Sequence, residues 1–564
     1  MNSLNKVKAH AAEKVNKALK RKLVKPDSFI YPPNPEFGDL SLACFELAKQ
    51  HKKTPIELCS ELVNKIPADK IIAGVKAVGP YLNFTFNKTN LTESVLKEIG
   101  KEKDKYGANK TGKSKKVMIE FSNANTHKEY HVGHLRNLCF GDSVSRILAA
   151  NGFKSIPVSY INDFGIHVAK TVWKLKNRGM KDIPQNKGFY LGQIYAQATK
   201  ELKEDEKANL EVRAIMKSIE SRKGEDHKLW FKTREWSIDQ FDKIYAELGV
   251  KFDNIFYESE FIEKGKDLVS ELYEKRVLKR SEGAIIADLG ESLGVLVIVR
   301  TDGTTTYPVA DIPLALEKFK KYKLDKSIYV VDVRQSLYFK QLFAILEKLG
   351  VKKEMVHLAY EFVKLPSGMM SSREGNVITY EDLKEKLLEK TISETKKRHE
   401  NWNSAKINQT AWKIAVGAVK FEMIKVSAGS VITFDIDQAL RFDGFTAAYL
   451  QYTFARVSSI LRKAGKQSAK ADYSQLAEPR EHQLILKLSK YPEITEKAGK
   501  NYDPAEIAKY LFELAQMFND YYHNIPVLKA EDSARQARLA LLSSVNTVIN
   551  NGLNLLGIEI LEEM

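Results

Sequence analysis

The chain has 564 residues, of which 43% are hydrophobic and 29% charged, with a mean hydropathy of -0.34 and a formal net charge of +17. This length exceeds one ordinary hydrophobic core, so two to four domains are expected, and the composition excludes a disordered or fibrous protein. The basic balance favours a partner rich in phosphates, such as a nucleic acid.

Membrane spans and disulfides are not expected. The longest strongly apolar stretch, residues 293–299, is far shorter than the ~20 residues needed to cross a bilayer. The N-terminal segment has lysines spread through it and an acidic Glu13, which favours an ordinary amphipathic helix over a targeting peptide. Cys44, Cys59 and Cys139 form no C-x-x-C pair, which argues against a thiolate zinc site and fits a reducing cytoplasm.

Residues 1 to about 110 alternate helical stretches with short strand-like runs. Helices are expected over residues 6–23, 40–51 and 55–66, and a strand over GPYLNFTFN at 79–87. This alternation predicts a small α/β domain. The polar segment KTGKSKK at 110–116 comes directly before an apolar strand and marks a domain boundary.

The pattern changes at residue 117 to strand, loop, helix and strand. VMIEF at 117–121 and SIPVSYI at 155–161 flank a helical segment at 131–150, and this βαβ unit predicts a Rossmann-like parallel sheet. Charged helical sequence between about 170 and 280 predicts an insertion that splits the domain in two. The second half is expected to comprise strands at 282–289, 294–300, 327–333 and 356–363, with helices at 311–319 and from Tyr338.

After about residue 400 no strand pattern persists, and apolar residues recur at helical spacing, as in Trp412, Ala415, Val419 and Met423. The sequence therefore predicts an α/β protein of three domains. These are a small α/β domain at 1–110, a Rossmann-like domain at 111–395 with its insertion at about 170–280, and an all-helical domain at 396–564.

The strongest chemical signal is His131-Val132-Gly133-His134, just after the first strand of the βαβ unit and at the start of its helix. A helix N-terminus there offers backbone N–H groups and a favourable dipole to phosphate, and Gly133 allows a nucleotide to approach closely. Histidines three residues apart lie on one face, so both can reach the same phosphates. A zinc site built from His127, His131 and His134 is the alternative on spacing, although no acidic or cysteine ligand is evident.

A second signal is the loop that contains Met370, Ser371, Ser372 and Arg373, flanked by glycines. Two hydroxyls, an arginine and flexible flanks suit a loop that closes on a polyphosphate. The motif is weak alone, but its order after the histidine motif in an α/β context makes the pair specific.

Together the two motifs resemble the signatures of class I aminoacyl-tRNA synthetases, H-x-G-H and K-M-S-K-S. Within that class the chain resembles the arginyl-tRNA synthetase family. The resemblance spans nearly the whole chain and rests on four segments: GPYLNFTFN at 79–87, IEFSNANTHKEYHVGHLRN at 119–137, TDGTTTYPVADIPLA at 301–315 and ALRFDGFTAAYLQYTFARVSSILRKAG at 439–465. It implies an N-terminal additional tRNA-binding domain, a catalytic domain and a helical anticodon-binding domain.

The resemblance also assigns roles to individual residues. Carboxylates suit a guanidinium, whose donors match a two-oxygen fork. The family pattern places arginine-binding groups at Glu120, Ser122, Asn125, Asp163, Tyr307, Asp311 and Gln335. Asp163 is expected either to bind the α-amino group or to order the site. Two structural alternatives remain open: Asp311 could cap a helix, and Glu120 could pair with a nearby arginine.

Catalysis is assigned to His131, His134, Ser371, Ser372 and Arg373, with Gly133 and Met370 in the ATP site. Compared with K-M-S-K-S, the loop has Met369 and Ser372 at the two lysine positions. Lys128, three residues before His131, is therefore expected to supply the missing charge; its alternative is a solvated loop residue.

Expected tRNA contacts are Asn83, Phe86, Tyr449, Tyr452 and Arg456, although the last three follow a helical spacing that also suits core packing. The implied partners are tRNA(Arg), arginine and ATP with Mg²⁺, without zinc or a prosthetic group, in a monomer. Three alternatives would each differ in a specific feature. A class I enzyme for another amino acid would lack the constellation of Glu120, Asp311 and Tyr307, and an RNA-binding paralogue would have lost the histidine motif. A small nucleotidyltransferase would not need the helical domain.

Overall fold

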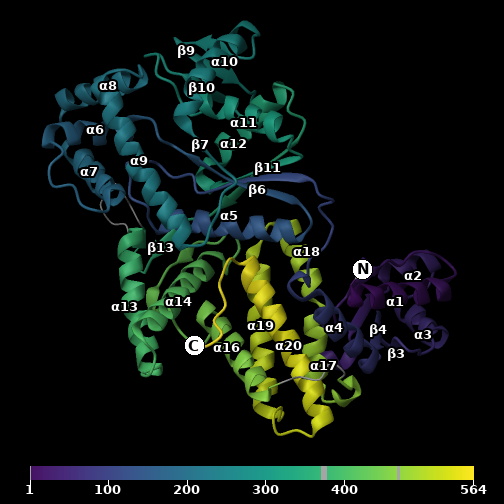
Figure 1. The fold of residues 1–564 in the computed structure, drawn as a ribbon. Helices are drawn as coiled ribbons and strands as arrows, with labels where there is room; N and C mark the ends of the chain where they lie inside the picture. The colour runs from purple at the N-terminus through teal and green to yellow at the C-terminus, as the bar shows by residue number, and fades with distance from the viewer. Residues whose placement is uncertain (1, 367, 370–377, 466–470) are drawn as a thin grey trace.

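The computed structural model describes residues 2–366, 368–369, 378–465 and 471–564. Figure 1 shows a small N-terminal region in purple, a central region in blue to teal, and a helical region in green to yellow. No described helix is both long enough and apolar enough to cross a membrane. Short 3-10 helices join the larger elements: η1 Pro26–Ser28, η2 Pro35–Phe37, η3 Lys103–Lys105, η4 Glu258–Glu260, η5 Val333–Gln335 and η6 Tyr473–Gln475.

The N-terminal region is an antiparallel four-stranded sheet, in the order β1-β2-β4-β3, with four helices. The elements are α1 Ser3–Leu19, β1 Phe29–Ile30, β2 Leu40–Ala43, α2 Phe45–His51, α3 Pro55–Lys65, β3 Ile72–Val78, β4 Tyr81–Phe86 and α4 Lys88–Glu102. The helix predicted over 40–51 is wrong in its first part. Leu40 pairs with Phe84 as a strand residue, because cross-strand pairing decides between helix and strand for so short an apolar run.

The central region is built on a five-stranded parallel sheet in the order β12-β11-β5-β6-β7. Figure 1 shows α5 on the side of this sheet that faces the helical region, with α11 and α12 on the opposite side. The predicted βαβ unit and parallel sheet are confirmed. The elements are β5 Lys116–Glu120, α5 Val132–Ala150, β6 Lys154–Ile161, β7 Asn254–Tyr257, α11 Pro308–Tyr322, β11 Lys326–Asp332, α12 Ser336–Lys348 and β12 Glu354–Tyr360.

The segment between β6 and α11 contains two excursions from the parallel sheet, one before β7 and one after it. Its elements are α6 Ile166–Arg178, α7 Lys187–Glu201, α8 Glu206–Glu220 and α9 Gly224–Glu247 before β7, then α10 Ile262–Glu274, β8 Lys279–Ser281, β9 Ala284–Asp288 and β10 Val295–Val299. The expected insertion at about 170–280 thus contains a sheet strand, β7, which pairs with β6 in parallel. Strands β8, β9 and β10 form a separate antiparallel sheet; local strand patterns do not reveal which sheet a strand joins.

The remainder of the chain is almost entirely helical. Its elements are β13 Val363–Leu365, β14 Gly368–Met369, α13 Tyr380–Arg398, α14 Ser404–Ile424, β15 Ile432–Thr433, α15 Ile436–Ala439, α16 Ala447–Ala464, α17 Pro479–Ser489, α18 Tyr491–Asn501, α19 Pro504–Asn524 and α20 Asp532–Leu555. The long helices α14, α16, α19 and α20 pack against one another (Figure 1).

Helix α5 joins the sheet to the helical region through buried polar contacts. The Arg136 guanidinium, which is 1% exposed, donates to the carbonyl oxygens of Met423 at 2.9 Å, Ala428 at 3.1 Å and Ser430 at 3.2 Å. Farther along, Ser143 donates to the carbonyl oxygen of Leu555 at 2.9 Å. These bonds fix the helical region directly to the helix that carries the histidine motif.

Candidate active site

A cleft of about 920 Å³ opens at the carboxyl ends of the parallel strands. Glu120 ends β5, Asn162 follows β6, Asp332 ends β11 and Tyr360 ends β12, and all four line the cleft. Ligands of open α/β sheets bind at this edge. The cleft has two chemically distinct ends, one at the N-terminus of α5 and one between β5, α11 and α12.

The histidine motif forms the N-terminal cap of α5. The backbone N–H of Gly133 donates to Nδ1 of His131 at 3.1 Å, and that of His131 donates to Nδ1 of His134 at 3.2 Å. The two rings stack with their centroids 3.9 Å apart. Because both Nδ1 atoms accept, each neutral ring carries its proton on Nε2 and presents an N–H donor.

Burial keeps both imidazoles uncharged. It lowers the pKa of His131 to about 4, assisted by the positive charge of Lys128, and lowers the pKa of His134 well below its usual value. Both histidines and Gly133 line the cleft. This end of the cleft is therefore suited to hydrogen bonding with anionic oxygens at neutral pH, without adding a charge of its own.

The absence of a side chain at Gly133 is needed by the fold itself, in addition to any access for a nucleotide. A Cβ at this position would lie 3.0 Å from Cε1 and 3.1 Å from Nδ1 of His131. The glycine thus leaves room for the imidazole that caps its own helix.

Lys128 lies beside the histidine motif, on the loop between β5 and α5. Its ammonium group is 5.3 Å from the centroid of the Tyr195 ring, and its charge contributes to the lowered pKa values of His131 and His134. The structure therefore places a cation next to the α5 terminus, although Lys128 is not among the residues that line the cleft.

Asp311 lies at the other end of the cleft, in the first turns of α11. Its carboxylate accepts a hydrogen bond from the Tyr338 hydroxyl of α12 and interacts with the Tyr160 hydroxyl of β6. Burial raises the pKa of Asp311 to about 6, and the nearby charge of Glu120 adds to the increase. No hydrogen bond from a backbone N–H to this carboxylate is found in the described structure, so a capping role is not supported.

Glu120 faces the same end of the cleft and is 3% exposed. Its Oε2 atom is paired with the ammonium group of Lys318, and Asn123 donates to Oε1 at 3.4 Å. The expected alternative, a structural ion pair, is thus present, but the partner is a lysine rather than an arginine. Glu120 still lines the cleft, so the ion pair does not remove it from the site.

Asn125, Tyr307 and Gln335 also line the cleft. Asn125 forms a β-bridge with Asn162. Tyr307 is 67% exposed at the N-terminus of α11. The structure therefore brings five of the seven expected arginine-binding residues together.

The other two, Ser122 and Asp163, are buried beside the cleft and do not line it. The Ser122 hydroxyl donates to the Tyr245 hydroxyl at 2.9 Å. The Asp163 carboxylate accepts from Nε of Arg234 at 2.6 Å and from the backbone N–H of Ser259 at 2.8 Å. This geometry agrees with the ordering role of Asp163 and places its carboxylate away from an amino-acid ligand.

The loop residues Met370, Ser371, Ser372 and Arg373 lie outside the described residues. The strands that precede this loop are described: β13 pairs with β14, and β13 also pairs with β15 of the helical region. Val363, the first residue of β13, lines the cleft, so the strand pair that precedes the loop contributes to the cleft wall through β13.

The structure does not place Asn83 and Phe86 on a surface that RNA can reach. They are 2% and 1% exposed on β4, which lies between β2 and β3. The position of the motif predicts the strand correctly, but the exposure of its side chains depends on the elements that pack on both sides of a central strand.

Tyr449, Tyr452 and Arg456 form a half-buried group on α16. Arg456 donates to the Tyr452 hydroxyl at 2.9 Å and to the side-chain oxygen of Asn519 at 3.0 Å, and Asn519 donates to the Tyr449 hydroxyl at 2.8 Å. Asn519 therefore links Arg456 to Tyr449, Arg456 itself holds Tyr452, and all three expected residues keep part of their surface in contact with solvent.

No group of three or more potential metal ligands is found among the described residues. The His127 ring faces α9, where its Nε2 atom is 2.8 Å from the Thr233 hydroxyl, and burial lowers its pKa to about 3. Both ring nitrogens of His127 thus lie within hydrogen-bond distance of threonine hydroxyls, those of Thr126 and Thr233.

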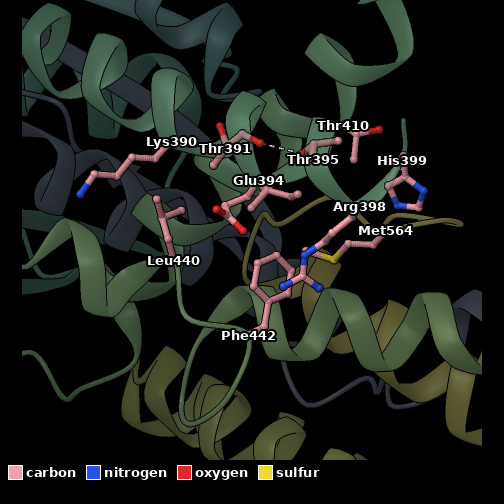
Figure 2. Close-up of a pocket in the computed structure, with 11 residues that line it drawn as sticks. Lys390, Thr391, Glu394, Thr395, Arg398, His399, Thr410, Leu440, Phe442 and Met564 are labelled. Atoms are coloured by element: carbon pink, nitrogen blue, oxygen red, sulfur yellow. Dashed lines mark hydrogen bonds between the residues drawn. The ribbon is translucent and has the colours of Figure 1, made fainter. Parts of the chain in front are cut away.

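A second cavity lies in the helical region, between α13, α14 and the end of the chain (Figure 2). Figure 2 shows Arg398 beside Phe442, with the guanidinium 4.0 Å from the ring centroid, and Met564 close by. Its volume of about 30 Å³ is the space of about one water molecule. It shares no lining residue with the cleft and is too small for a substrate.

Sequence reasoning missed Tyr160, Lys318 and Tyr338. Lys318 sits in the run EKFKKY, which resembles a solvated charged face. The available signal was spacing, because Asp311, Leu314 and Lys318 follow the i, i+3, i+7 pattern of one helix face. No comparable signal points to the two tyrosines, which reach Asp311 from other elements.

The chain matches three family models. They are described as tRNA synthetases class I (R), catalytic domain, over residues 95–434; DALR anticodon binding domain, over 450–564; and Arginyl tRNA synthetase N terminal domain, over 5–86.

Individual relatives agree along the whole chain. An arginine–tRNA ligase of Bdellovibrio bacteriovorus is 36% identical, covering 95% of this chain and 94% of its own. One from Halothermothrix orenii is 35% identical, covering 94% and 95%. Among solved structures, the arginyl-tRNA synthetase of Thermus thermophilus superposes with a TM-score of 0.81 at 26% identity, covering 100% of this chain and 99% of its own.

Proposed function

Because the chain belongs to the arginyl-tRNA synthetase family, we propose that its cleft activates arginine with ATP and transfers the arginyl group to tRNA(Arg). The observation that supports this most directly is the placement of two carboxylates, Glu120 and Asp311, at one end of a cleft whose other end is the histidine-capped terminus of α5. One end suits a guanidinium and the other suits phosphates.

In the first step an oxygen of the arginine carboxylate attacks the α-phosphorus of ATP, taken as its magnesium complex. The bond to the bridging oxygen breaks, and pyrophosphate leaves with arginyl-adenylate remaining. The Nε2–H groups of His131 and His134 donate to phosphate oxygens, and Ser371, Ser372 and Arg373 contribute hydroxyl and guanidinium donors to the same phosphates. Catalysis of this kind rests on positioning and charge stabilisation, without a covalent enzyme intermediate.

Arginine is oriented by its side chain. Asp311 and Glu120 accept the guanidinium N–H groups, while Asn125, Tyr307 and Gln335 surround the rest of the amino acid. Ser122 and Asp163 support this arrangement from behind, because their side chains bond to Tyr245 and Arg234. The carboxylate of arginine then points along the cleft toward α5.

In the second step the 2′-hydroxyl of the terminal tRNA adenosine attacks the adenylate carbonyl carbon, and AMP leaves. The helical domain binds the tRNA at a distance, with Tyr449, Tyr452 and Arg456 as contact residues. The enzyme works as a cytoplasmic monomer and needs neither zinc nor a prosthetic group.

The decisive experiment is aminoacylation of total tRNA by the purified protein, with each of the twenty amino acids supplied in turn. Charging is expected with arginine alone, and only with ATP present. Charging with a different amino acid would show that Glu120 and Asp311 serve another purpose, and a complete lack of charging would favour an RNA-binding protein.

A further inference from the structure

Lys318 is a fully buried cation that the proposed reaction does not use. It projects from α11 onto the face of the parallel sheet, is 1% exposed, and lines the arginine end of the cleft. A buried ammonium is costly unless it is paired and surrounded by compensating groups. A buried lysine next to a site for a cationic substrate would repel that substrate, so its presence there calls for a functional explanation.

The surroundings of Lys318 come from four adjacent strands. Its ammonium is paired with Glu120 of β5 and lies 5.7 Å from the ring centroid of Tyr160 on β6, 5.1 Å from that of Phe256 on β7 and 5.5 Å from that of Tyr329 on β11. Aromatic faces at such distances stabilise a cation. The three rings and Glu120 together hold the ammonium group in a fixed position, and the ammonium group in turn holds one carboxylate oxygen of Glu120.

The charges around this end of the cleft nearly balance. Glu120 and Asp311 are two carboxylates and Lys318 is one ammonium, which leaves one negative charge. Burial raises the pKa of Glu258, a third carboxyl group nearby, to about 8, which favours its uncharged form. One net negative charge is the complement of one guanidinium.

We propose that Lys318 is a specificity-determining positioning residue, which orients Glu120 and sets the net charge of the guanidinium pocket at one negative charge. This inference rests on the proposed function. Without Lys318 the pocket would hold two carboxylates with no cation, and like charges at this separation favour protonation of one of them. A protonated Asp311 offers the guanidinium one acceptor fewer.

The ionisation of Asp311 depends on groups from every element packed around it. They are Glu120 of β5, Tyr160 of β6, Glu258 of η4, Tyr329 of β11, Tyr338 of α12, and Tyr307 and Lys318 of α11 itself. Lys318 is the one cation among them, and its charge lowers the pKa of Asp311. Its removal should therefore raise that pKa, with the hydroxyl groups unchanged.

The test measures kcat/KM for arginine in tRNA charging between pH 5.5 and 8.5. In Lys318→Met we expect the acidic limb to move to higher pH by about one unit, with a roughly tenfold loss of kcat/KM below the limb and an unchanged KM for ATP. The control is Lys320→Met, which removes a charge from the exposed face of the same helix and should leave the limb in place.

The double variant Lys318→Met/Glu120→Gln separates charge setting from structural support. It removes one cation and one anion together, so the limb should return toward its wild-type position even though arginine binds more weakly. The proposal would be overturned if the acidic limb of Lys318→Met lay at the same pH as that of the wild type. It would also be overturned if the limb of the double variant were displaced as far as that of the single variant. Wild-type charging with arginine is scored separately and tests the proposed function alone.

Discussion

Asp311 combines a raised pKa of about 6 with a position at the bottom of the arginine end of the cleft. The guanidinium stays protonated across the accessible pH range, so the acidic limb of the arginine kcat/KM profile reports an enzyme group. Because the ionised carboxylate binds arginine, kcat/KM should be half-maximal near pH 6, approach its full value about one pH unit higher, and fall as the pH drops further. The measurement is the charging rate at limiting arginine as a function of pH.

Replacement of Asp311 by asparagine tests the same group at constant pH. An amide cannot accept the whole guanidinium fork, and the loss of one partner of a buried charge pair costs about 3 to 5 kcal/mol. Asp311→Asn should therefore reduce kcat/KM for arginine by more than roughly a hundredfold, while the KM for ATP stays near wild type. Unchanged arginine kinetics would return Asp311 to a structural role.

Lys128 is the second residue whose function can be tested alone. The loop lacks a lysine at Met369 and at Ser372, and the structure places the Lys128 charge close to His131. If Lys128 stabilises the charge that develops on pyrophosphate, Lys128→Ala should slow adenylate formation about 10² to 10³-fold with little change in arginine affinity. Pre-steady-state adenylate formation measures this directly.

The rescue variant for Lys128 restores a lysine at the loop position where K-M-S-K-S has its first lysine. Lys128→Ala/Met369→Lys should recover part of the lost rate, because the cation and not the position is proposed to matter. Activation by Lys128→Ala at the wild-type rate would refute the compensation. A slow double variant, with no recovery, would indicate that Lys128 acts through its place next to the histidines.

At the scale of elements, the N-terminus of α5 depends on the fit between Gly133 and the His131 ring. A Cβ at residue 133 would press against that ring at 3.0 to 3.1 Å, so the imidazole must move by a few tenths of an ångström. Small misplacements of groups that position substrates are costly, and Gly133→Ala should lower the rate of adenylate formation by about tenfold. The KM for arginine, set at the other end of the cleft, should stay unchanged.

Gly100→Ala is the matched control for this change. Gly100 also lies within a helix, α4, and a Cβ there meets no atom within 4 Å. Catalysis should be unaffected, and the free energy of unfolding should rise by up to about 1 kcal/mol. An equal loss of rate in both variants would mean that the effect is not specific to the histidine cap.

The sequence predicted elements well where periodicity and motif agreed, as in the βαβ unit around α5. It failed at Leu40, where a strand pairing with Phe84 overrides a helical pattern, and it could not assign β7 to the main sheet. Site prediction followed the same rule. Among the motif residues, Glu120 and Asp311 lie in the cleft, but Ser122 and Asp163 are buried beside it. Lys318 depends on rings supplied by three separate strands.

At the scale of the molecule, one residue of the arginine end of the cleft remains uncovered. Tyr307, which lines this end, is 67% exposed, so bound tRNA could order it and complete the site. We expect arginine-dependent ATP–pyrophosphate exchange to be weak without tRNA and to increase strongly when tRNA(Arg) is added. Robust exchange by rigorously tRNA-free enzyme would contradict this dependence.

Helix α5 also limits how the protein can be recombined. Its first turn holds the histidine motif, while Arg136 and Ser143 on the same helix bind backbone carbonyls of the helical region. A chimaera made by exchanging residues 396–564 with those of a relative would keep both ends of the cleft. Its α5 side chains would nevertheless fail to match the backbone carbonyls of the exchanged helical region. A functional chimaera would require the buried face of α5 to be transplanted together with the helical region.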